Sequence, residues 1–134
     1  MAGYADRAEA MFEQDFNCAQ AVFGAFAEEY GLDMGTAMRV ASSMGGGIGH
    51  SGEACGAALG MVLAIGMLKG YGEEPPDMET KMAHNARVKR MMETFRAEFG
   101  AMDCDDLRVP GNRAVCVPFV RYAAELVEKE LGGK

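Results

Sequence analysis

Several features of common enzyme and membrane-protein classes are missing from this chain of 134 residues. It has no Trp and only two His. With so few histidines, and no Ser/His/Asp spacing of note, we expect no hydrolysis or acyl transfer by a catalytic triad. The longest uncharged run, 54–68, is shorter than the ~20 apolar residues that cross a bilayer. The first twenty residues carry acidic side chains throughout and lack the apolar region of a secretory signal. We therefore expect no membrane span and a chain that starts as the mature protein.

Positive charge is also scarce. The formal net charge is −7, whereas binding to nucleic acid depends on clustered Lys and Arg that neutralise phosphates. Nucleic acid is therefore excluded as a partner. The only concentration of basic residues comprises Lys81, Arg87, Lys89, Arg90 and Arg96. We expect these residues to form a solvated helix face that answers acidic neighbours.

The composition is otherwise that of an ordinary globular protein, with 49% hydrophobic and 25% charged residues, which excludes disorder. The length predicts one domain, residues 1–134, with a core that needs no disulfides. Methionine is in excess, with 12 residues. Several are spaced as core residues rather than as soft-metal ligands, namely Met38, Met61, Met82, Met91 and Met92. We expect them to fill a core that lacks Trp.

Apolar residues recur at helical spacing along most of the chain. The predicted helices cover 4–13, 18–30, 34–44, 51–69, 78–99 and 118–131. Asn17 and Gln20 form the pattern of a capping box, and Asp33 and Asp77 are placed to cap the helices that follow them. Segment 104–112 is predicted as loop, and no strand pattern occurs. The sequence therefore predicts an all-α, single-domain bundle of about five or six helices.

The chain contains four cysteines, Cys18, Cys55, Cys104 and Cys116. None forms a CxxC pair, so their spacing gives no zinc-ribbon or thioredoxin signature. Without an export signal we expect the protein in the cytoplasm, where thiol chemistry and metal binding are more common than static disulfides.

The predicted position of the cysteines is more informative than their spacing. Cys18 follows the cap Asn17, Cys55 lies in the first turn of the helix predicted from Ser51 or Gly52, and Cys116 lies two residues before Pro118. Three of the four thus fall at helix N-termini, where backbone N–H groups favour a thiolate. Acidic neighbours oppose this effect, namely Asp15, Glu53, Asp103, Asp105 and Asp106. A bound metal would compensate for them, and the alternative is that the cysteines are small buried hydrophobic residues.

A glycine-rich segment, 44–52, precedes Cys55. It contains a GxGxxG pattern, but helix rather than strand is predicted before it and no basic residue is at hand, so dinucleotide binding is not expected. We expect a backbone with positive φ that presents Cys55, with Gly52 and Gly56 beside a bound cofactor. Further glycines in the central helix, expected to allow close helix packing, are Gly60, Gly66 and Gly70.

The two histidines are His50 and His84. His50 lies five residues before Cys55 and is a candidate ligand or proton shuttle, although a single loop histidine is usually neither. His84 falls on the apolar face of a predicted helix and is interpreted as a half-buried packing residue.

The cysteine pattern resembles that of the small redox-active proteins named after the string C…GCAxxG…C…C. The matching segments are NCAQAV at 17–22, GEACGAALG at 52–60 with its CGAxxG core, CDDL at 104–107, and Cys116 ahead of the last helix. The resemblance covers essentially the whole chain and implies a helical protein whose four cysteines serve redox or metal chemistry. Val117 stands directly after Cys116 where a proline is expected, and Pro118 comes one place later.

A similar cysteine-bearing segment occurs in split-Soret cytochromes, where it is associated with an iron–sulfur cluster. The resemblance therefore favours a 2Fe–2S cluster here. The sequence has no CxxCH haem-attachment motif, so the resemblance does not extend to haem binding. The leading hypothesis is that Cys18, Cys55, Cys104 and Cys116 hold this cluster for electron transfer or redox sensing.

Two alternatives remain open. One is thiol–disulfide exchange, with Cys55 as nucleophile and another cysteine, such as Cys18, resolving it. The other is a non-catalytic module in which the four cysteines hold structural zinc. An electron-transfer protein is the partner expected for the redox hypotheses. The glycine-rich central helix can pack within the bundle or across a two-fold axis, and we favour a homodimer.

Overall fold

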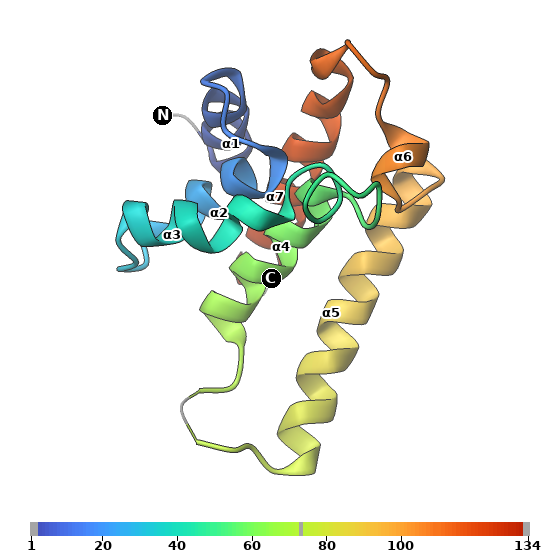
Figure 1. The fold of residues 1–134 in the computed structure, drawn as a ribbon. Coiled ribbons are helices and arrows are strands. Elements are labelled where there is room, and N and C mark those ends of the chain that lie inside the picture. The colour runs from blue at the N-terminus through green and yellow to red at the C-terminus, as the bar shows by residue number, and fades with distance from the viewer. Residues whose placement is uncertain (1–2, 73, 133–134) are drawn as a thin grey trace.

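The computed structural model describes residues 3–72 and 74–132, and helices make up most of them (Figure 1). The helices are α1 (Tyr4–Glu13), α2 (Cys18–Ala27), α3 (Met34–Ala41), the 3-10 helix η1 (Ser42–Met44), α4 (Gly56–Lys69), α5 (Met78–Phe99), α6 (Cys104–Leu107), the 3-10 helix η2 (Arg113–Cys116) and α7 (Val117–Gly132). In the described ranges β-pairing is limited to two isolated bridges. The predicted all-α class is confirmed, with seven α-helices in the described chain rather than five or six.

Short-range capping fixes the helix ends that the sequence predicted. The backbone N–H of Gln20 donates to Asn17 Oδ1 at 2.8 Å, and that of Asn17 donates to Gln20 Oε1 at 2.9 Å, which completes the capping box of α2. Asp77 caps α5 by accepting from the Thr80 N–H at 2.7 Å. The same helix ends at Gly100, whose φ of +77° suits glycine. These predictions are confirmed because each depends on neighbours in the chain.

Other boundaries differ from the prediction. α4 begins at Gly56 rather than near residue 51, because the glycine-rich segment forms a turn-rich loop with several positive φ angles. Cys55 is consequently the N-cap residue of α4. Segment 104–107 forms the short helix α6 where loop was predicted. α2 and α3 also end three residues early, at Ala27 and Ala41.

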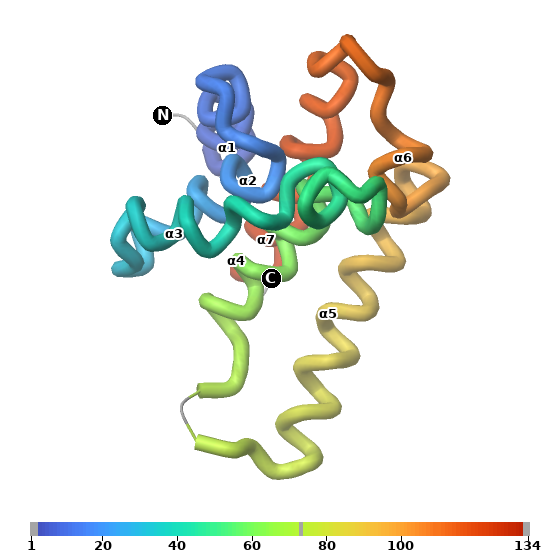
Figure 2. Tube along the Cα trace, viewed as in Figure 1, coloured from blue at the N-terminus to red at the C-terminus, as the bar shows by residue number. Residues whose placement is uncertain are grey.

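The core lies where α1, α2, α4 and α7 pack against one another, as the trace in Figure 2 shows. Met61 and Ile65 of α4 are fully buried. α5 stands apart, since Met91 and Phe95 are its only buried residues among those described (Figure 1). Met82, predicted in the core, is 62% exposed because the first half of α5 extends beyond the bundle. No helix in the described chain is both long enough and apolar enough to cross a membrane.

Two glycines let α2 and α4 approach closely. A Cβ at Gly60 would lie 2.7 Å from the carbonyl oxygen of Ala19, and one at Gly56 would lie 3.3 Å from Cys18 Cβ. The predicted packing role is confirmed at these positions but is wrong for Gly66, which has nothing within 4 Å of an added Cβ. The close approach places Cys18 beside the start of α4.

The basic face of α5 meets an acidic neighbour, as expected. Arg87 Nε lies 3.4 Å from Glu130 Oε1 of α7, and Arg90 pairs with the same carboxylate. These exposed ion pairs contribute little stability. They connect the middle of α5 with the last turns of α7.

Candidate functional site

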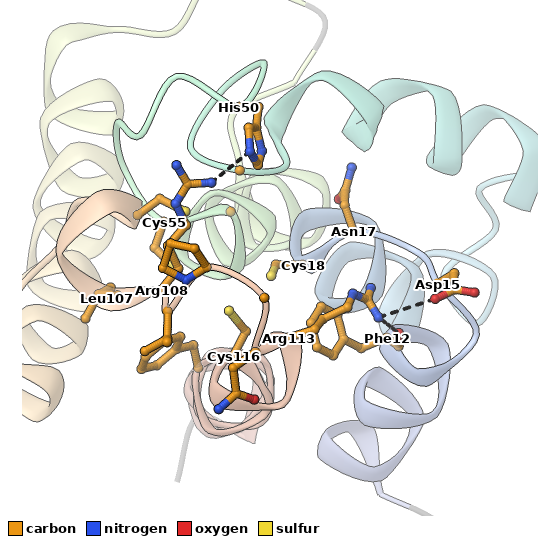
Figure 3. A pocket seen from close by; sticks show the side chains of 18 residues that line it. Phe12, Asp15, Asn17, Cys18, His50, Cys55, Leu107, Arg108, Arg113 and Cys116 are labelled. Atoms are coloured by element: carbon orange, nitrogen blue, oxygen red, sulfur yellow. Dashed lines mark hydrogen bonds and ion pairs between the residues drawn. The ribbon is translucent and has the colours of Figure 1, made fainter.

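A pocket of about 720 Å³ is lined by all four cysteines (Figure 3). Each comes from the start of a different helix. Cys18 begins α2, Cys55 caps α4, Cys104 begins α6, and Cys116 ends η2 directly before α7. All four are free thiols. The sequence predicted three of them at helix starts. Cys104 is the fourth, because the segment that it begins forms the helix α6 rather than the predicted loop.

Backbone hydrogen bonds hold one pair of cysteines together. The N–H of Cys55 donates to the carbonyl of Met102 at 2.8 Å, and the N–H of Cys104 donates to the carbonyl of Glu53 at 2.6 Å. The isolated bridge between Ala54 and Asp103 lies between these bonds. The loop before α4 and the loop before α6 are thereby clamped to each other.

The glycine-rich segment makes this clamp possible. Gly47 and Gly52 have φ of +75° and +77°, so the predicted positive-φ backbone is confirmed. A Cβ at Gly47 would lie 2.9 Å from Cys104 Cβ, and one at Gly52 would collide with the carboxylate of Asp105. Gly56 lines the pocket, whereas Gly52 packs under α6. Their predicted contact with a cofactor remains a prediction.

The two cysteines of the second pair, Cys18 and Cys116, face each other across the pocket. Their side chains come from α2 and η2 and point toward each other (Figure 3). Arg113 holds Cys116 in place by fastening η2 to the end of α1. Its guanidinium donates to the carbonyl of Phe12 at 2.6 Å and lies 3.7 Å from the centre of the Phe12 ring.

The pairing of the two thiols separates their proton affinities. Interaction with Cys116, together with burial, raises the pKa of Cys18. Interaction with Cys18 and, to a smaller extent, the positive charges of Arg113 and Arg108 outweigh burial and lower the pKa of Cys116 from its ordinary value of 9.0 to about 7. The pair therefore favours a Cys116 thiolate beside a Cys18 thiol.

In the other pair, Cys55 and Cys104, both thiols have a raised pKa. Cys55 is 4% exposed, and its burial raises the pKa of its thiol to about 11, although the N–H groups of Ala58 and Ala57 act to lower it. Burial also raises the pKa of Cys104, partly offset by the charge of Arg108. Cys116 is therefore easier to ionise than Cys55, which the sequence suggested as nucleophile. Burial of the thiol outweighs the helix N-terminus at Cys55.

Arg108, at the end of α6, connects this helix with the glycine-rich loop beside the thiols. It donates through Nη1 to His50 Nε2 and through Nη2 to Asp105 Oδ1, both at 2.8 Å. His50, proposed as a ligand or proton shuttle, thus contacts an arginine. Arg108 and Arg113 both line the pocket but were not chosen from the sequence. Their only signal there was their distance of four and three residues from Cys104 and Cys116.

His84 lies outside this pocket and packs edge-to-face against Tyr71, with 5.7 Å between ring centroids. It is half-buried, as predicted. Its Nδ1 is buried without a hydrogen-bond partner among the described residues.

The metal-ligand prediction can be compared with the donor chemistry of the pocket. Across 3–72 and 74–132, no group of three or more His, Cys, Asp or Glu side chains is placed to hold a metal ion. Four thiols that face one pocket are nevertheless the donor set used by iron–sulfur clusters and by structural zinc. In donor type and number the residues fit either group, so the ligand set remains a prediction.

The fold and the site define a class: an all-α protein with a pocket of four cysteine thiols at helix starts. A family model described as "Putative redox-active protein (C_GCAxxG_C_C)" matches residues 16–130. The chain belongs to this family, as its cysteine pattern predicted. No curated protein and no solved structure matches the chain.

Proposed function

We propose that this protein is a redox carrier that cycles between a Cys18–Cys116 dithiol and the corresponding disulfide. The observation that carries the proposal is that these two side chains, brought into one pocket from α2 and η2, point toward each other (Figure 3). Two facing thiols are the arrangement from which an intramolecular disulfide can form. The lowered pKa of Cys116 supports the proposal, because the thiolate is the nucleophile in exchange.

The exchange proceeds in two balanced steps. The Cys116 thiolate attacks one sulfur of a substrate disulfide, the substrate S–S bond breaks, and one substrate thiolate leaves. The sulfur of Cys18 then attacks Cys116 in the mixed disulfide, and the second substrate thiolate leaves. The Cys18 proton passes to a departing thiolate, and the other thiolate takes its proton from water. The protein pair is oxidised by two electrons while the substrate is reduced to two thiols.

This assignment changes the roles that the sequence suggested. Cys55 was the expected nucleophile, with Cys18 resolving it. We now propose Cys116 as nucleophile and keep Cys18 as the resolving thiol. Cys55 and Cys104 line the same pocket, where their high proton affinity keeps them protonated near neutral pH. A reduced resting pair suits a reducing compartment such as the cytoplasm.

A second candidate function is electron transfer or redox sensing through a 2Fe–2S cluster held by Cys18, Cys55, Cys104 and Cys116. It is supported by the fact that all four thiols line one pocket, which a two-cysteine mechanism does not require. A bound cluster would supply one-electron chemistry. The N–H groups of Ala57 and Ala58, which act to lower the pKa of Cys55, would tune a ligand at that position. Structural zinc in the same four thiols stays an untested alternative.

Purification without oxygen separates these functions. For the dithiol carrier we expect colourless protein without stoichiometric metal, in which mild oxidation removes two of four titratable thiols. Peptide mapping without reductant should then place the disulfide between Cys18 and Cys116. Brown protein with absorption between roughly 400 and 600 nm and bound iron would overturn this in favour of the cluster. Colourless protein with one zinc per chain would favour the structural site.

Two variants provide the matched control. Cys18→Ser should prevent oxidation of the pair and leave Cys116 as a single reactive thiol. Cys55→Ser, which changes a cysteine in the same pocket, should retain the two-thiol oxidation. If a cluster is the working group, both variants lose iron alike.

A further inference from the structure

We propose that the pocket binds small organic disulfides that carry a carboxylate, and that Arg108 is the residue that holds this carboxylate. The inference rests on the dithiol function proposed above and adds the chemical class of its substrate. It is carried by the size of the pocket, the balance of charge on its lining and the geometry of Arg108.

The pocket has the dimensions of a small-molecule site. Its volume of about 720 Å³ falls within the range of roughly 300–1,000 Å³ that such sites occupy. Apolar side chains, among them Phe12, Leu107, Pro110 and Phe119, line it beside the thiols. Cys18 and Cys116 are only partly exposed on this concave surface. A small disulfide can enter the hollow and bring its sulfur atoms to them.

Two arginines line the pocket of a chain that is acidic overall. They are Arg108 and Arg113, and Asp15 is the carboxylate on the same lining. The Asp15 side chain is 95% exposed to solvent, whereas that of Arg108 is 29% exposed. Asp105 pairs with Arg108 and Asp15 with Arg113, and in each pair the carboxylate is more exposed to solvent than the arginine. The guanidinium groups are therefore the less screened charges beside the pocket, which favours an anionic ligand.

The two arginines differ in what their guanidinium groups already bind. Arg113 is occupied by the carbonyl groups at the end of α1 and by the face of Phe12. Arg108 uses one N–H for His50 and one for Asp105, which leaves three of the five donors of a guanidinium for a ligand. Arginine presents these donors in a planar fork that matches a carboxylate.

Arg108 is also held in a fixed place near the thiols. His50 and Asp105 contact it from the glycine-rich loop and from α6, so its position is set by two segments. Arg108 lines the same pocket as Cys18 and Cys116 (Figure 3). A carboxylate bound to Arg108 would therefore share this pocket with the two thiols. The reaction is the exchange given above, with the anionic disulfide reduced to two carboxylate-bearing thiols.

Three small disulfides of similar size but different charge test the proposal: 3,3′-dithiodipropionate (anionic), 2-hydroxyethyl disulfide (neutral) and cystamine (cationic). The measurement is the rate at which each removes two thiols from the reduced full-length protein. Each rate is divided by the rate of the same disulfide with a small free thiol, because the three leaving thiols differ in pKa. For the unmodified protein we expect the corrected rate of the anionic compound to be about tenfold higher than that of the cationic one. Equal corrected rates, or a higher one for cystamine, would overturn the proposal.

Variants assign the preference to Arg108. Arg108→Gln should bring the ratio of corrected anionic to cationic rates close to one, and Arg108→Lys should keep part of the preference. The ratio is the useful readout, because a change in thiolate content alters all three rates equally. Arg39→Gln is the matched control, since it removes the same charge from an exposed position on α3. A ratio unchanged in Arg108→Gln would exclude Arg108 as the binding residue.

Salt provides a test that does not depend on a variant folding. Raising the ionic strength should slow the anionic disulfide, speed the cationic one and leave the neutral one unchanged. Rates that do not respond to salt would overturn the electrostatic preference. Failure of the underlying function looks different, because then none of the three disulfides forms the Cys18–Cys116 bond.

Discussion

The two sides of the pocket hold their cysteines by different means. Cys55 and Cys104 are positioned through backbone hydrogen bonds between their loops, whereas Cys18 and Cys116 come from α2 and η2 and turn their side chains toward each other (Figure 3). Backbone bonds fix where a thiol lies, and burial then raises its pKa. In the facing pair, the pKa of Cys18 is raised and that of Cys116 is lowered. The difference teaches that nearness to a helix start does not by itself make a cysteine reactive.

The largest expected effect comes from removing one thiol of the facing pair, Cys18 and Cys116. Cys116→Ser should abolish the oxidation of two thiols by a small disulfide, because no nucleophile remains next to Cys18. Cys104→Ser should retain it. Titration of thiols before and after oxidation measures both. If Cys104→Ser lost the reaction and Cys116→Ser retained it, the reactive thiol would belong to the Cys55 and Cys104 pair instead.

Alkylation by iodoacetamide across pH sharpens the same comparison. Because the pKa is about 7 for Cys116 and about 11 for Cys55, modification of Cys116 should rise through neutral pH, and modification of Cys55 only under strongly alkaline conditions. At pH 7 the thiolate fractions differ by about 10³-fold or more, since each pKa unit is a factor of ten. Mass spectrometry of the labelled peptides gives each rate. A common midpoint for both cysteines would contradict the separation.

The distance between the two sides depends on how closely α2 and α4 pack. Gly60→Ala should destabilise the protein by about 1–3 kcal/mol, because the new Cβ meets the Ala19 carbonyl and the side chain of Val22. Gly66→Ala is the control on the same helix, with open space around the new Cβ, and should stabilise α4 by up to about 1 kcal/mol. Urea unfolding measures both changes. Equal stability of the two variants would show that the close approach is not required.

The smallest expected effect concerns the charge of Arg113. Arg113→Gln should raise the pKa of Cys116, because the positive charge that favours the thiolate is lost. The reactivity midpoint should then move to higher pH by roughly a fraction of a pH unit, since the Arg113 side chain is partly solvated. Arg113→Lys keeps the charge and should move the midpoint less. Identical pH profiles for the Gln and Lys variants would show that the charge does not act on Cys116.

Much of the fold was predictable from local patterns. The capping box at Asn17, the cap at Asp77 and the stop at Gly100 were all correct, because each involves groups only a few residues apart. The length of the turn-rich loop before α4 was not, since the sequence gives no measure of how far a run of glycines continues before a helix begins. The helix at 104–107 was missed because its start is tied by a hydrogen bond to Glu53, far away in the chain.

The chain by itself determined the helical class, the ends of several helices and the four cysteines as the residues to consider, because caps, periodicity and residue chemistry act over short distances. Only the tertiary structure decided which thiols meet. Close packing of α2 on α4 and the tie between Arg113 and α1 place Cys116 against Cys18, while burial keeps Cys55 protonated. Proton affinity depends on burial and on contacts between distant segments, and these exist only in the folded molecule.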